Sequence, residues 1–568
     1  MPTVSVSREY FIQLFGEDIS DSKLDEIMAS YGIELDEIID EAERNCTVPI
    51  PTYKVDVSAN RGDLLCAENI VRVLRVFLGK DEYQTVNTTP SGITINVDPS
   101  TAIIRPYIVA AVVKNVSLNQ RSYNSFIDHQ DKLHHNVCRR RSLGAIGTHD
   151  MKKMDTSKIT YTAESPKNII FKALNQAQKL NGDELFEVLE SDKKLQEFLQ
   201  LIQQSHVWPV IRDATGEVLS LPPIINSEYS KIDLTTTDIF IEVTATDLTK
   251  GNIALNSVVS GLLAHSSTPC EVQSVDVHYQ DISSAPLLRN LQNTTPDLSA
   301  RTFSMSLDQA ARVIGLTFTP EEAISYLQKM SIKAIKSANN GLICTVPFER
   351  ADVLNEIDLI EDIAIGYGFN EIAQQSTYPR TVTIGSTLRS YKVQEAVRRE
   401  LSASGCIETL NFSLCQASDA FVLPLPIALA NAKTATFSHG RASLIPGMLR
   451  AASCGQFRPL PVKIFETAEV FCETSNDLGV SCEVKIGVLV GGTSDLFGEL
   501  HGILDRIGVR LGRNYHLKEE SFDWMISGRS CGVYLEGKRV GFAGVVGIKQ
   551  LNEFKIPFPV SVFEIDME

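Results

Sequence analysis

The sequence predicts a multidomain α+β protein, and three observations support that fold class. The chain has 568 residues, which is too many for one hydrophobic core and corresponds to roughly three to five domains. Its hydrophobic fraction of 43% and charged fraction of 22% are ordinary for a globular protein. Adjacent strand-like segments flanked by short helices indicate antiparallel sheets rather than repeated βαβ units.

The first predicted domain, residues 1–90, has the mixed pattern of an α/β domain. Ser20 is placed to cap a helix whose apolar positions recur with helical spacing from Leu24 onward. A short strand then leads into the polar turn 60–63, and a helix with a buried stripe follows.

Residues 95–272 are rich in strand-like segments, and two helical segments interrupt them. The apolar runs 107–116 and 239–247 fit strands. The segments 121–139 and 251–267 have helical spacing instead. We therefore predict a second, strand-rich domain.

The remainder of the chain divides into two further predicted domains. Residues 300–376 contain short helices and a hairpin, which suggests a winged-helix-like module, and Thr319 with Glu322 forms a capping box. Such a module need not bind DNA. In residues 377–568 strands return with helices among them, which indicates an antiparallel α+β domain.

One stretch of this module, "FERADVLNEIDLIEDIAIGYGFNEI", is unusually acidic. Asp352 is placed as the N-cap of a helix. At about 100° per residue, Asp358, Glu361 and Asp362 share one sector roughly 100° wide beside the apolar stripe. Asp352 lies well away in angle, so it joins the other three only if its side chain turns back.

Three neighbouring carboxylates repel one another on a helix, so a cation would relieve the strain. Arg350, a distant lysine, or a hard divalent ion such as Mg²⁺ could supply the charge. The pattern alone favours a solvated helix face over a metal site, and both interpretations stay open at this point.

The charge balance bears on nucleic acid as a partner. Lysine and arginine number 53 against 70 acids, a formal charge of −17, so the whole molecule would repel a phosphate chain. Contact with RNA would need a local basic patch. "HHNVCRRR", with Arg139, Arg140 and Arg141 after His134 and His135, is one candidate, and a plain solvated surface is the alternative.

Several classes of protein are disfavoured. No apolar run approaches the roughly 18 residues of a membrane span, and the first residues resemble neither a secretory signal nor a transit peptide, so we expect a cytoplasmic protein without membrane contact. The 11 cysteines form no CxxC pair or zinc-like cluster. A free-standing Mg²⁺-dependent phosphoryl-transfer enzyme is disfavoured because no phosphate-cradling GxxxxGK[ST] loop is present.

The acidic stretch resembles the signature helix of the phenylalanyl-tRNA synthetase beta subunit, in its cytosolic eukaryotic and archaeal form, through its R-x-D, D-x-x-E-D and tyrosine-glycine pattern. Other segments are similar to that family in the same order along nearly the whole chain. They are "YKVDVSANRGDLLCAENIVRVLRVF", "SFIDHQDKLHHNVCRRRSLGAIGTHD", "LPPIINSEYSKIDLTTTDIFIEVTATD", "HGRASLIPGMLRA" and "KIFETAEVF".

The resemblance implies a heterotetramer of two alpha and two beta subunits, which charges tRNA(Phe) with phenylalanine using ATP. The synthetic site would lie on the alpha subunit, which would bind ATP and phenylalanine. Residues 377–568 would be a degenerate class II synthetase-like core. Consistent with that loss, Ile464 stands two residues before Glu466, where a class II strand has the arginine that grips phosphate.

The resemblance also implies that residues 95–272 are an editing domain that hydrolyses mischarged Tyr-tRNA(Phe). Such a site is needed because an apolar pocket cannot strongly reject an added hydroxyl. Glu242 resembles the residue that reads the tyrosine hydroxyl, since a carboxylate is a strong acceptor. Pro223, Asn226 and Ser227 would lie near the amino acid.

His149 and Asp150 would orient water or contact the end of the tRNA. No Ser/His/Asp or Cys/His nucleophile is evident, so water would attack the ester. The alternative function is a purely structural interaction subunit that has lost editing.

For the acidic helix, the resemblance implies that Mg²⁺ is bound by Asp352, Asp358, Glu361 and Asp362. Its role would be structural rather than catalytic.

Overall fold

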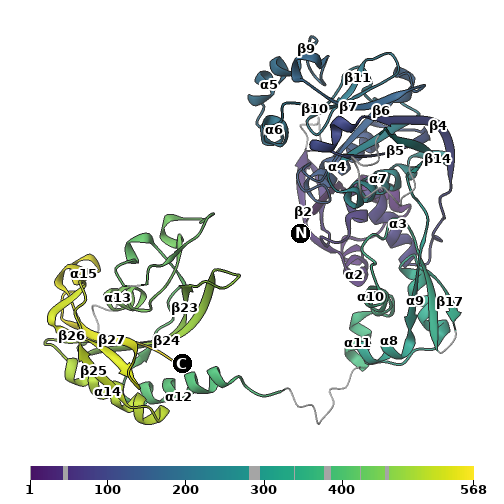
Figure 1. Ribbon diagram of the computed structural model, residues 1–568. Coiled ribbons are helices and arrows are strands. Elements are labelled where there is room, and N and C mark those ends of the chain that lie inside the picture. Colours follow the sequence, from purple (N-terminus) through teal and green to yellow (C-terminus); the bar gives the residue numbers. More distant parts are fainter. Residues whose placement is uncertain are drawn as a thin grey trace. The chain divides into compact units, whose positions relative to one another are not determined.

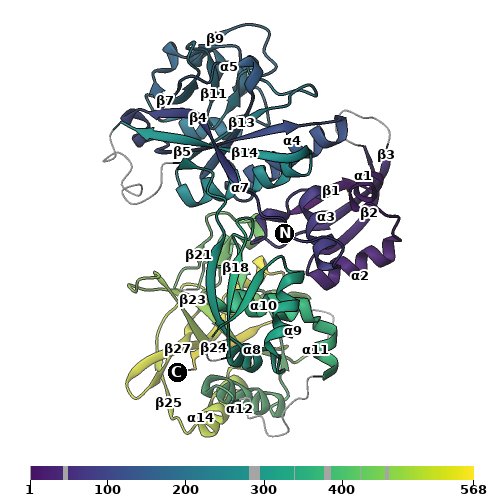
Figure 2. The same cartoon turned by 90° about the vertical axis from the view of Figure 1, so that its right-hand side faces the viewer.

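The chain begins with a three-stranded antiparallel sheet, in the order β1-β3-β2, packed against three helices (Figures 1 and 2). The elements are β1 Thr3–Ser7, α1 Arg8–Phe15, α2 Asp21–Tyr31, β2 Glu34–Ala42, β3 Pro49–Asp56 and α3 Ala67–Phe77. Ser20 caps α2 by accepting from the backbone N–H of Lys23, as predicted. Phe11, Leu24 and Leu74 are fully buried between the layers.

The computed structural model describes residues 2–42, 49–280, 294–337, 340–375, 385–422, 424–454 and 459–567. These fold as two compact units, Met1–Tyr378 and Pro379–Glu568.

A ten-stranded sheet forms the centre of the first unit. Its order is β12-β11-β10-β7-β4-β14-β5-β13-β6, with β15 paired to β14. The strands are β4 Thr88–Val97, β5 Tyr107–Val116, β6 Gly144–Asp150, β7 Ile159–Glu164, β10 Trp208–Arg212, β11 Val218–Leu221, β12 Ile225–Asn226, β13 Ile239–Ala245, β14 Ser266–Tyr279 and β15 Thr294–Thr295. Because β4 begins at Thr88 and β14 ends at Tyr279, the sheet extends beyond the predicted range 95–272 at both ends.

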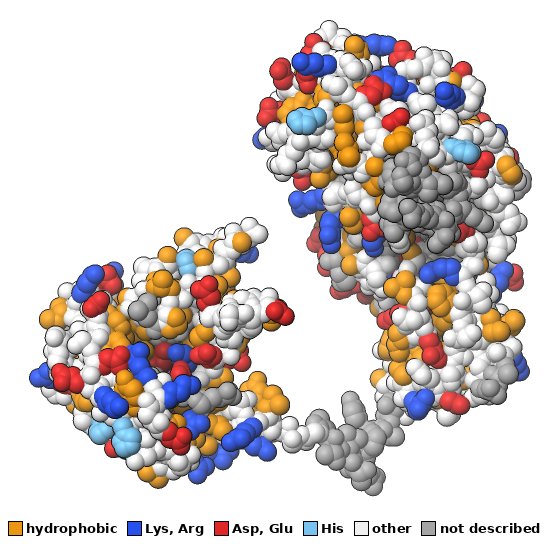
Figure 3. Space-filling view, viewed as in Figure 1, with side chains coloured by type: hydrophobic (Ala, Val, Ile, Leu, Met, Phe, Trp, Pro, Cys, Tyr) orange, Lys and Arg blue, Asp and Glu red, His pale blue; other side chains and the backbone are white. Residues whose placement is uncertain are grey.

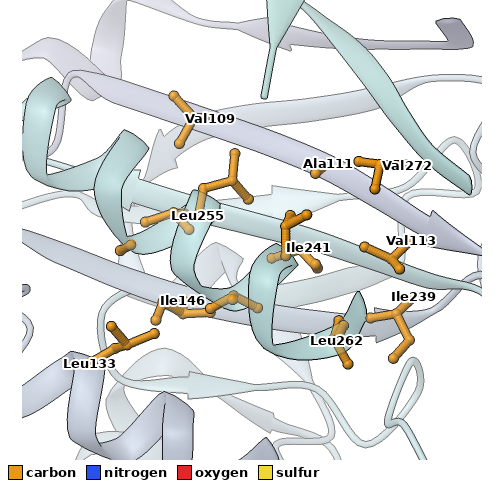
Figure 4. Close-up of a cluster of buried hydrophobic side chains, with 14 of the residues drawn as sticks. Val109, Ala111, Val113, Leu133, Ile146, Ile239, Ile241, Leu255, Leu262 and Val272 are labelled. Carbon is orange, nitrogen blue, oxygen red and sulfur yellow. The ribbon is translucent and has the colours of Figure 1, made fainter. Parts of the chain in front are cut away.

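Two helices cover one face of this sheet, α4 Gln120–His135 and α7 Leu248–Leu263. Figure 4 shows Leu255 and Leu262 of α7 pointing onto side chains of β5 and β13, and Figure 2 shows α7 lying along the sheet. Alternate residues of β13 point the other way, so Phe240 and Glu242 leave this core. That alternation brings Glu242 to a separate cavity.

A smaller layer extends from the β10–β12 end of the sheet. It contains the two-stranded pair β8 Ile170–Phe171 and β9 Leu180–Asn181, and the helices α5 Gly182–Glu190 and α6 Gln196–Gln203. Phe171, Leu185, Phe198 and Trp208 share its core.

The acidic stretch belongs to a small module at the end of the first unit. Its elements are β16 Arg301–Ser306, α8 Leu307–Ile314, α9 Pro320–Lys329, β17 Lys333–Ser337, β18 Gly341–Val346, α10 Glu356–Tyr367 and α11 Phe369–Gln375. The predicted capping box of Thr319 and Glu322 is present. The prediction that Asp352 caps the acidic helix is wrong, because Asn355 is the N-cap of α10.

The second unit is built on a seven-stranded sheet of order β19-β23-β24-β28-β27-β26-β25. Its strands are β19 Ile407–Glu408, β23 Val462–Glu473, β24 Val480–Gly491, β25 Tyr515–Glu519, β26 Met525–Leu535, β27 Lys538–Val546 and β28 Val560–Asp566. All neighbours are antiparallel except β19 and β23, which confirms the predicted sheet type. A small sheet adds β20 Leu414–Cys415, β21 Ile427–Ala428 and β22 His439–Gly440.

Helices cover both faces of the seven-stranded sheet. α12 Arg389–Ala403 and α14 Phe497–Leu511 pack on one face, and α13 Ile445–Cys454 packs on the other (Figure 1). The short α15 Ile548–Glu553 joins the last two strands. Among the described residues, no helix is long and apolar enough to cross a bilayer.

Candidate functional site

A cavity of about 330 Å³ is lined by α4, β6, Glu242 of β13 and the β11–β12 connection. Its volume is at the small end of ligand-binding pockets. The polar side chains that line it come from Gln130, His134, Arg141, Thr148, Ser220, Asn226, Ser227 and Glu242, among others.

Glu242 is the buried acid of this cavity, with only 1% of its surface exposed. Its Oε1 accepts a hydrogen bond from the Ser220 hydroxyl at 2.8 Å, whereas its Oε2 has no hydrogen-bond partner among the described residues. A buried polar atom without a partner costs about 1–3 kcal/mol, and more if it is charged. Oε2 is therefore an acceptor that a ligand hydroxyl could satisfy.

Gly147 provides the space for this carboxylate. It pairs directly with Glu242 across β6 and β13, and a Cβ atom at position 147 would collide with Oε1. Any larger residue there would displace the carboxylate, so the glycine is part of the site although it has no side chain.

His149 lies behind the carboxylate and not on the cavity wall. It is fully buried, and its Nδ1 is 2.7 Å from the Ser230 hydroxyl. Its Nε2 is 3.8 Å from Glu242 Oε1 and has no hydrogen-bond partner among the described residues. His149 is thus placed to restrict the position of Glu242.

Asp150 is used elsewhere in the fold. Its carboxylate accepts from the backbone N–H of Lys152 at 3.0 Å and from the Thr236 hydroxyl at 2.9 Å. It caps the short 3₁₀ helix Met151–Lys153. The structure therefore does not bring Asp150 to the cavity.

The loop predicted to hold the amino acid does border the cavity. The carbonyl of Pro223 accepts from Arg141 Nη1 at 3.1 Å. Ser227 is buried and its hydroxyl is engaged, donating to the Lys172 carbonyl at 3.2 Å. Asn226 is half-buried. Asn226 is therefore the residue of this loop whose side chain is best placed to meet a ligand.

The sequence prediction missed a set of donors that also line the cavity. Gln130 Nε2, His134 Nδ1 and Arg141 Nε are buried and have no acceptor among the described residues. His134 Nε2 accepts from the backbone N–H of Ile146 at 2.9 Å, which assigns the ring proton to Nδ1. Burial, with a further effect of Arg141, holds the pKa of His134 well below its ordinary value, so the ring is neutral.

The cavity therefore combines an unpaired acceptor at Glu242 with three unpaired N–H donors. Gln130 and His134 are four residues apart, so they share one face of α4. That spacing was visible in the sequence, but nothing in the sequence indicated that this face borders Glu242.

The acidic helix has a cation already, and it is a guanidinium. Arg350 is buried, and its Nη2 lies 2.8 Å from Asp352 Oδ2 and 2.9 Å from Asp362 Oδ2. Asp358 instead accepts from the backbone N–H groups of Leu354 and Asn355, at the start of α10.

Glu361 is exposed, so only two of the four predicted ligands meet. Across the described parts of the chain, no three His, Cys, Asp or Glu side chains are grouped so that they could hold a metal. The donor set therefore does not fit a resident magnesium ion in this chain alone, and the predicted magnesium site of the assembled enzyme stays a prediction.

Glu466 and Ile464, two residues apart on β23, are both covered by protein. Glu466 is 1% exposed and accepts from Arg441 Nη1 and Asn411 Nδ2, each at 2.7 Å. Ile464 is buried in the same cluster as Met448 of α13. Helix α13 thus packs over Ile464 of β23, the position at which a class II strand has its phosphate-gripping arginine.

Comparison with known proteins matches each of these regions. Four family profiles cover the chain: the Phe-tRNA synthetase beta subunit B1 domain (1–80), the B3/4 domain (109–275), the tRNA synthetase B5 domain (303–369) and the phenylalanyl tRNA synthetase beta chain CLM domain (375–567). The cavity lies within the B3/4 match and the acidic helix within the B5 match.

Curated relatives match over the full length. The chain is 34% identical to the cytoplasmic phenylalanine--tRNA ligase beta subunit of Arabidopsis thaliana, with all of both chains covered. It is also 34% identical to the Homo sapiens beta subunit, covering 100% of this chain and 99% of that one.

A crystal structure of an N-terminal fragment of the Pyrococcus horikoshii beta subunit matches with 29% identity and a TM-score of 0.58. The match covers 64% of this chain and 99% of the fragment. The chain therefore belongs to the phenylalanine--tRNA ligase beta subunit family and is part of an aminoacyl-tRNA synthetase.

Proposed function

We propose that this chain pairs with an alpha subunit in an α₂β₂ ligase that charges tRNA(Phe), and that its own reaction is hydrolysis of mischarged Tyr-tRNA(Phe). The relatives that match over their full length are named as beta subunits, which supports the partnership. A cytoplasmic location is proposed on the same ground, since one of these relatives is the cytoplasmic form.

The observation that carries the editing proposal is the unpaired Oε2 of Glu242 in a small buried cavity. A tyrosine phenol would donate to this oxygen in a charge-assisted hydrogen bond. Phenylalanine would leave the carboxylate oxygen buried and unpaired, and sites built to bind a hydroxyl reject analogues without it by large factors. The cavity would therefore select the mischarged product and spare the correct one.

The unpaired donors of the cavity suit the ester end of the substrate. Gln130, His134 and Arg141 could donate to the carbonyl oxygen as it gains negative charge during attack by water. Asn226 could bind the amino group through its carbonyl oxygen. In this proposal His149 positions Glu242, and Asp150 supports the end of β6 without touching the substrate.

The synthetic reaction is assigned to the alpha subunit, which would bind ATP and phenylalanine. Burial of Ile464 beneath α13 supports that assignment, because this position of the strand offers no arginine to grip a phosphate. Magnesium enters the proposal only as an ion that the ligase family uses, and no step in this chain depends on it.

The editing proposal is tested in the reconstituted complex with Glu242→Ala. Hydrolysis of Tyr-tRNA(Phe) should fall by about 100-fold or more, while hydrolysis of Phe-tRNA(Phe) relative to Tyr-tRNA(Phe) should rise. Glu187→Gln, which removes an exposed charge from α5 of the same domain, serves as the control and should leave both rates unchanged.

Undiminished hydrolysis in Glu242→Ala would refute the role of Glu242. If the wild-type complex charges tRNA(Phe) but does not hydrolyse Tyr-tRNA(Phe), the chain is a structural subunit without editing.

A further inference from the structure

Three consecutive arginines next to the cavity have a backbone conformation that L-residues rarely adopt. The φ angles of Arg139, Arg140 and Arg141 are 44°, 50° and 62°, all in the left-handed region. Each such residue costs on the order of 1 kcal/mol or more, and strained residues persist only where surrounding contacts hold them. Three consecutive residues in this conformation therefore require surrounding contacts that hold them there.

The turn is held from both sides. The buried guanidinium of Arg105 donates through Nη1 to the carbonyl of Arg141 at 3.1 Å. The backbone N–H of Arg141 donates to the His134 carbonyl at 3.2 Å, and the Ser142 hydroxyl donates to the Arg139 carbonyl at 2.6 Å. These bonds fix the directions in which the three side chains leave the backbone.

The three side chains take different directions. Arg141 turns inward, where its guanidinium stacks on Phe198 of α6 at 4.3 Å and its Nε lines the cavity without a partner. Arg139 and Arg140 are exposed. Arg140 has only a long contact of 3.4 Å to Glu197, also on α6, and the Arg139 guanidinium has no partner among the described residues.

The exposed pair lies close to the cavity. Arg140 and Arg141 both contact the first turns of α6, and the residues immediately before that helix, Lys194 and Leu195, line the cavity. The guanidinium groups of Arg139 and Arg140 are thus exposed close to a cavity that holds both unpaired donors, Arg141 Nε among them, and the Glu242 carboxylate.

This local charge contrasts with the rest of the molecule. The formal charge is −17, and Figure 3 shows Lys and Arg interspersed with Asp and Glu on the face in view. An overall acidic protein gains no general attraction for RNA, so an RNA end must be recruited by a local site. Guanidinium groups bind phosphate through paired N–H donors, which suits this position.

We propose that Arg139 and Arg140 form a phosphate clamp for the 3′-terminal nucleotides of the RNA whose aminoacyl ester enters the cavity. The inference rests on the proposed editing function and names the surface by which this chain meets the RNA. Arg141 connects the clamp to the cavity. The turn that exposes Arg139 and Arg140 directs the Arg141 side chain into the cavity, where the ester is proposed to bind.

The clamp is tested by binding of a fluorescent RNA hairpin, ending in a single-stranded CCA, to the full-length chain. Arg139→Ala/Arg140→Ala should weaken binding by about tenfold at moderate salt. The slope of log affinity against log salt should fall by roughly 1.4, about 0.7 for each lost contact to a single strand. Arg139→Lys/Arg140→Lys keeps the charge and should keep most of the slope.

The matched control is Arg312→Ala/Arg399→Ala, which removes the same charge from two exposed helix positions. It should leave both affinity and slope unchanged. An equal loss in this control, or no loss in the Arg139→Ala/Arg140→Ala variant, overturns the proposal.

A second readout uses hydrolysis of Tyr-tRNA(Phe) by the complex under single-turnover conditions. The Arg139→Ala/Arg140→Ala variant should raise the half-saturating enzyme concentration about tenfold while the maximal rate is unchanged. A fall in the maximal rate alone contradicts a role in phosphate binding. Should the wild-type complex fail to hydrolyse this substrate, the editing proposal fails, and hairpin binding, which needs no reaction, still decides the clamp.

Discussion

Glu242 and Gly147 lie directly opposite each other on β13 and β6, and the missing Cβ of the glycine leaves the space that the carboxylate occupies. The carboxylate is therefore positioned by a neighbour that makes no hydrogen bond to it. The Ser220 hydroxyl fixes Oε1 from the other side at 2.8 Å.

Gly147→Ala tests this relationship. The new methyl group would push the carboxylate from its place, and overpacking of this kind costs typically 1–3 kcal/mol. We expect hydrolysis of Tyr-tRNA(Phe) to fall by about 10- to 100-fold while charging by the complex is retained. Deacylation rates and thermal unfolding measure both effects. The same substitution at Gly498, which has open space around its Cβ position in α14, should leave deacylation unchanged and should not lower the thermal stability.

Arg350→Met tests the assignment of the cation at the acidic helix. It would leave Asp352 and Asp362 buried without their partner, and breaking a buried pair in this way costs about 3–5 kcal/mol. Thermal unfolding should show a large loss of stability. Arg350→Lys should recover only part of it, because an ammonium cannot reproduce the paired contacts of a guanidinium.

Removal of magnesium is the complementary measurement. Because a guanidinium supplies the positive charge between Asp352 and Asp362, excess chelator should leave the melting temperature of the isolated chain unchanged. A fall of several degrees on chelation, restored by Mg²⁺, contradicts this account and supports the four-carboxylate site.

Arg140→Gly should raise the stability of the protein and weaken its binding to RNA. Arg140→Gly removes a left-handed φ of 50° from an L-residue, so the free energy of unfolding should rise by up to about 1 kcal/mol. The same variant loses one phosphate contact and should bind the RNA hairpin more weakly. Arg312→Gly, inside α8, should instead destabilise the protein by about 1 kcal/mol and leave hairpin binding unaltered.

Ile464→Arg restores the residue that a class II strand would carry, and it should fail to restore function. The side chain is 4% exposed beneath α13, so an arginine there would be a buried charge without a partner. We expect a strongly destabilised second unit and no ATP-dependent activation of phenylalanine by this chain. Ile464→Leu, which conserves volume, should cost less than about 1.5 kcal/mol.

The sequence correctly predicted helix caps and helical segments, because both depend on residues close together in the chain. The capping box of Thr319 and Glu322 is present, and so is the Ser20 cap of α2. The helical segments 121–139 and 251–267 correspond to α4 and α7, each within a few residues. Caps and apolar spacing involve residues three or four positions apart, so they can be read without knowledge of the fold.

The error at the acidic helix has a tertiary cause. Aspartate is a favoured N-cap residue, but Arg350 binds the Asp352 carboxylate through two nitrogens. Asn355 is the N-cap of α10 instead. Spacing on a helix correctly grouped Asp358, Glu361 and Asp362 in angle. It could not show that one would be buried, one exposed and one used at the helix start.

The sequence by itself determined the family and the order of its matched domains, because motifs are written in consecutive residues. Through that resemblance it also named Glu242 as a candidate, whose role stays a prediction. Only the tertiary structure decided which groups meet Glu242. Gly147, Ser220 and the donors Gln130, His134 and Arg141 reach the same cavity from different elements, across strand pairs and a helix. The hydrogen-bond state of a buried atom depends on every neighbour around it, and those neighbours are chosen by the packing of distant segments.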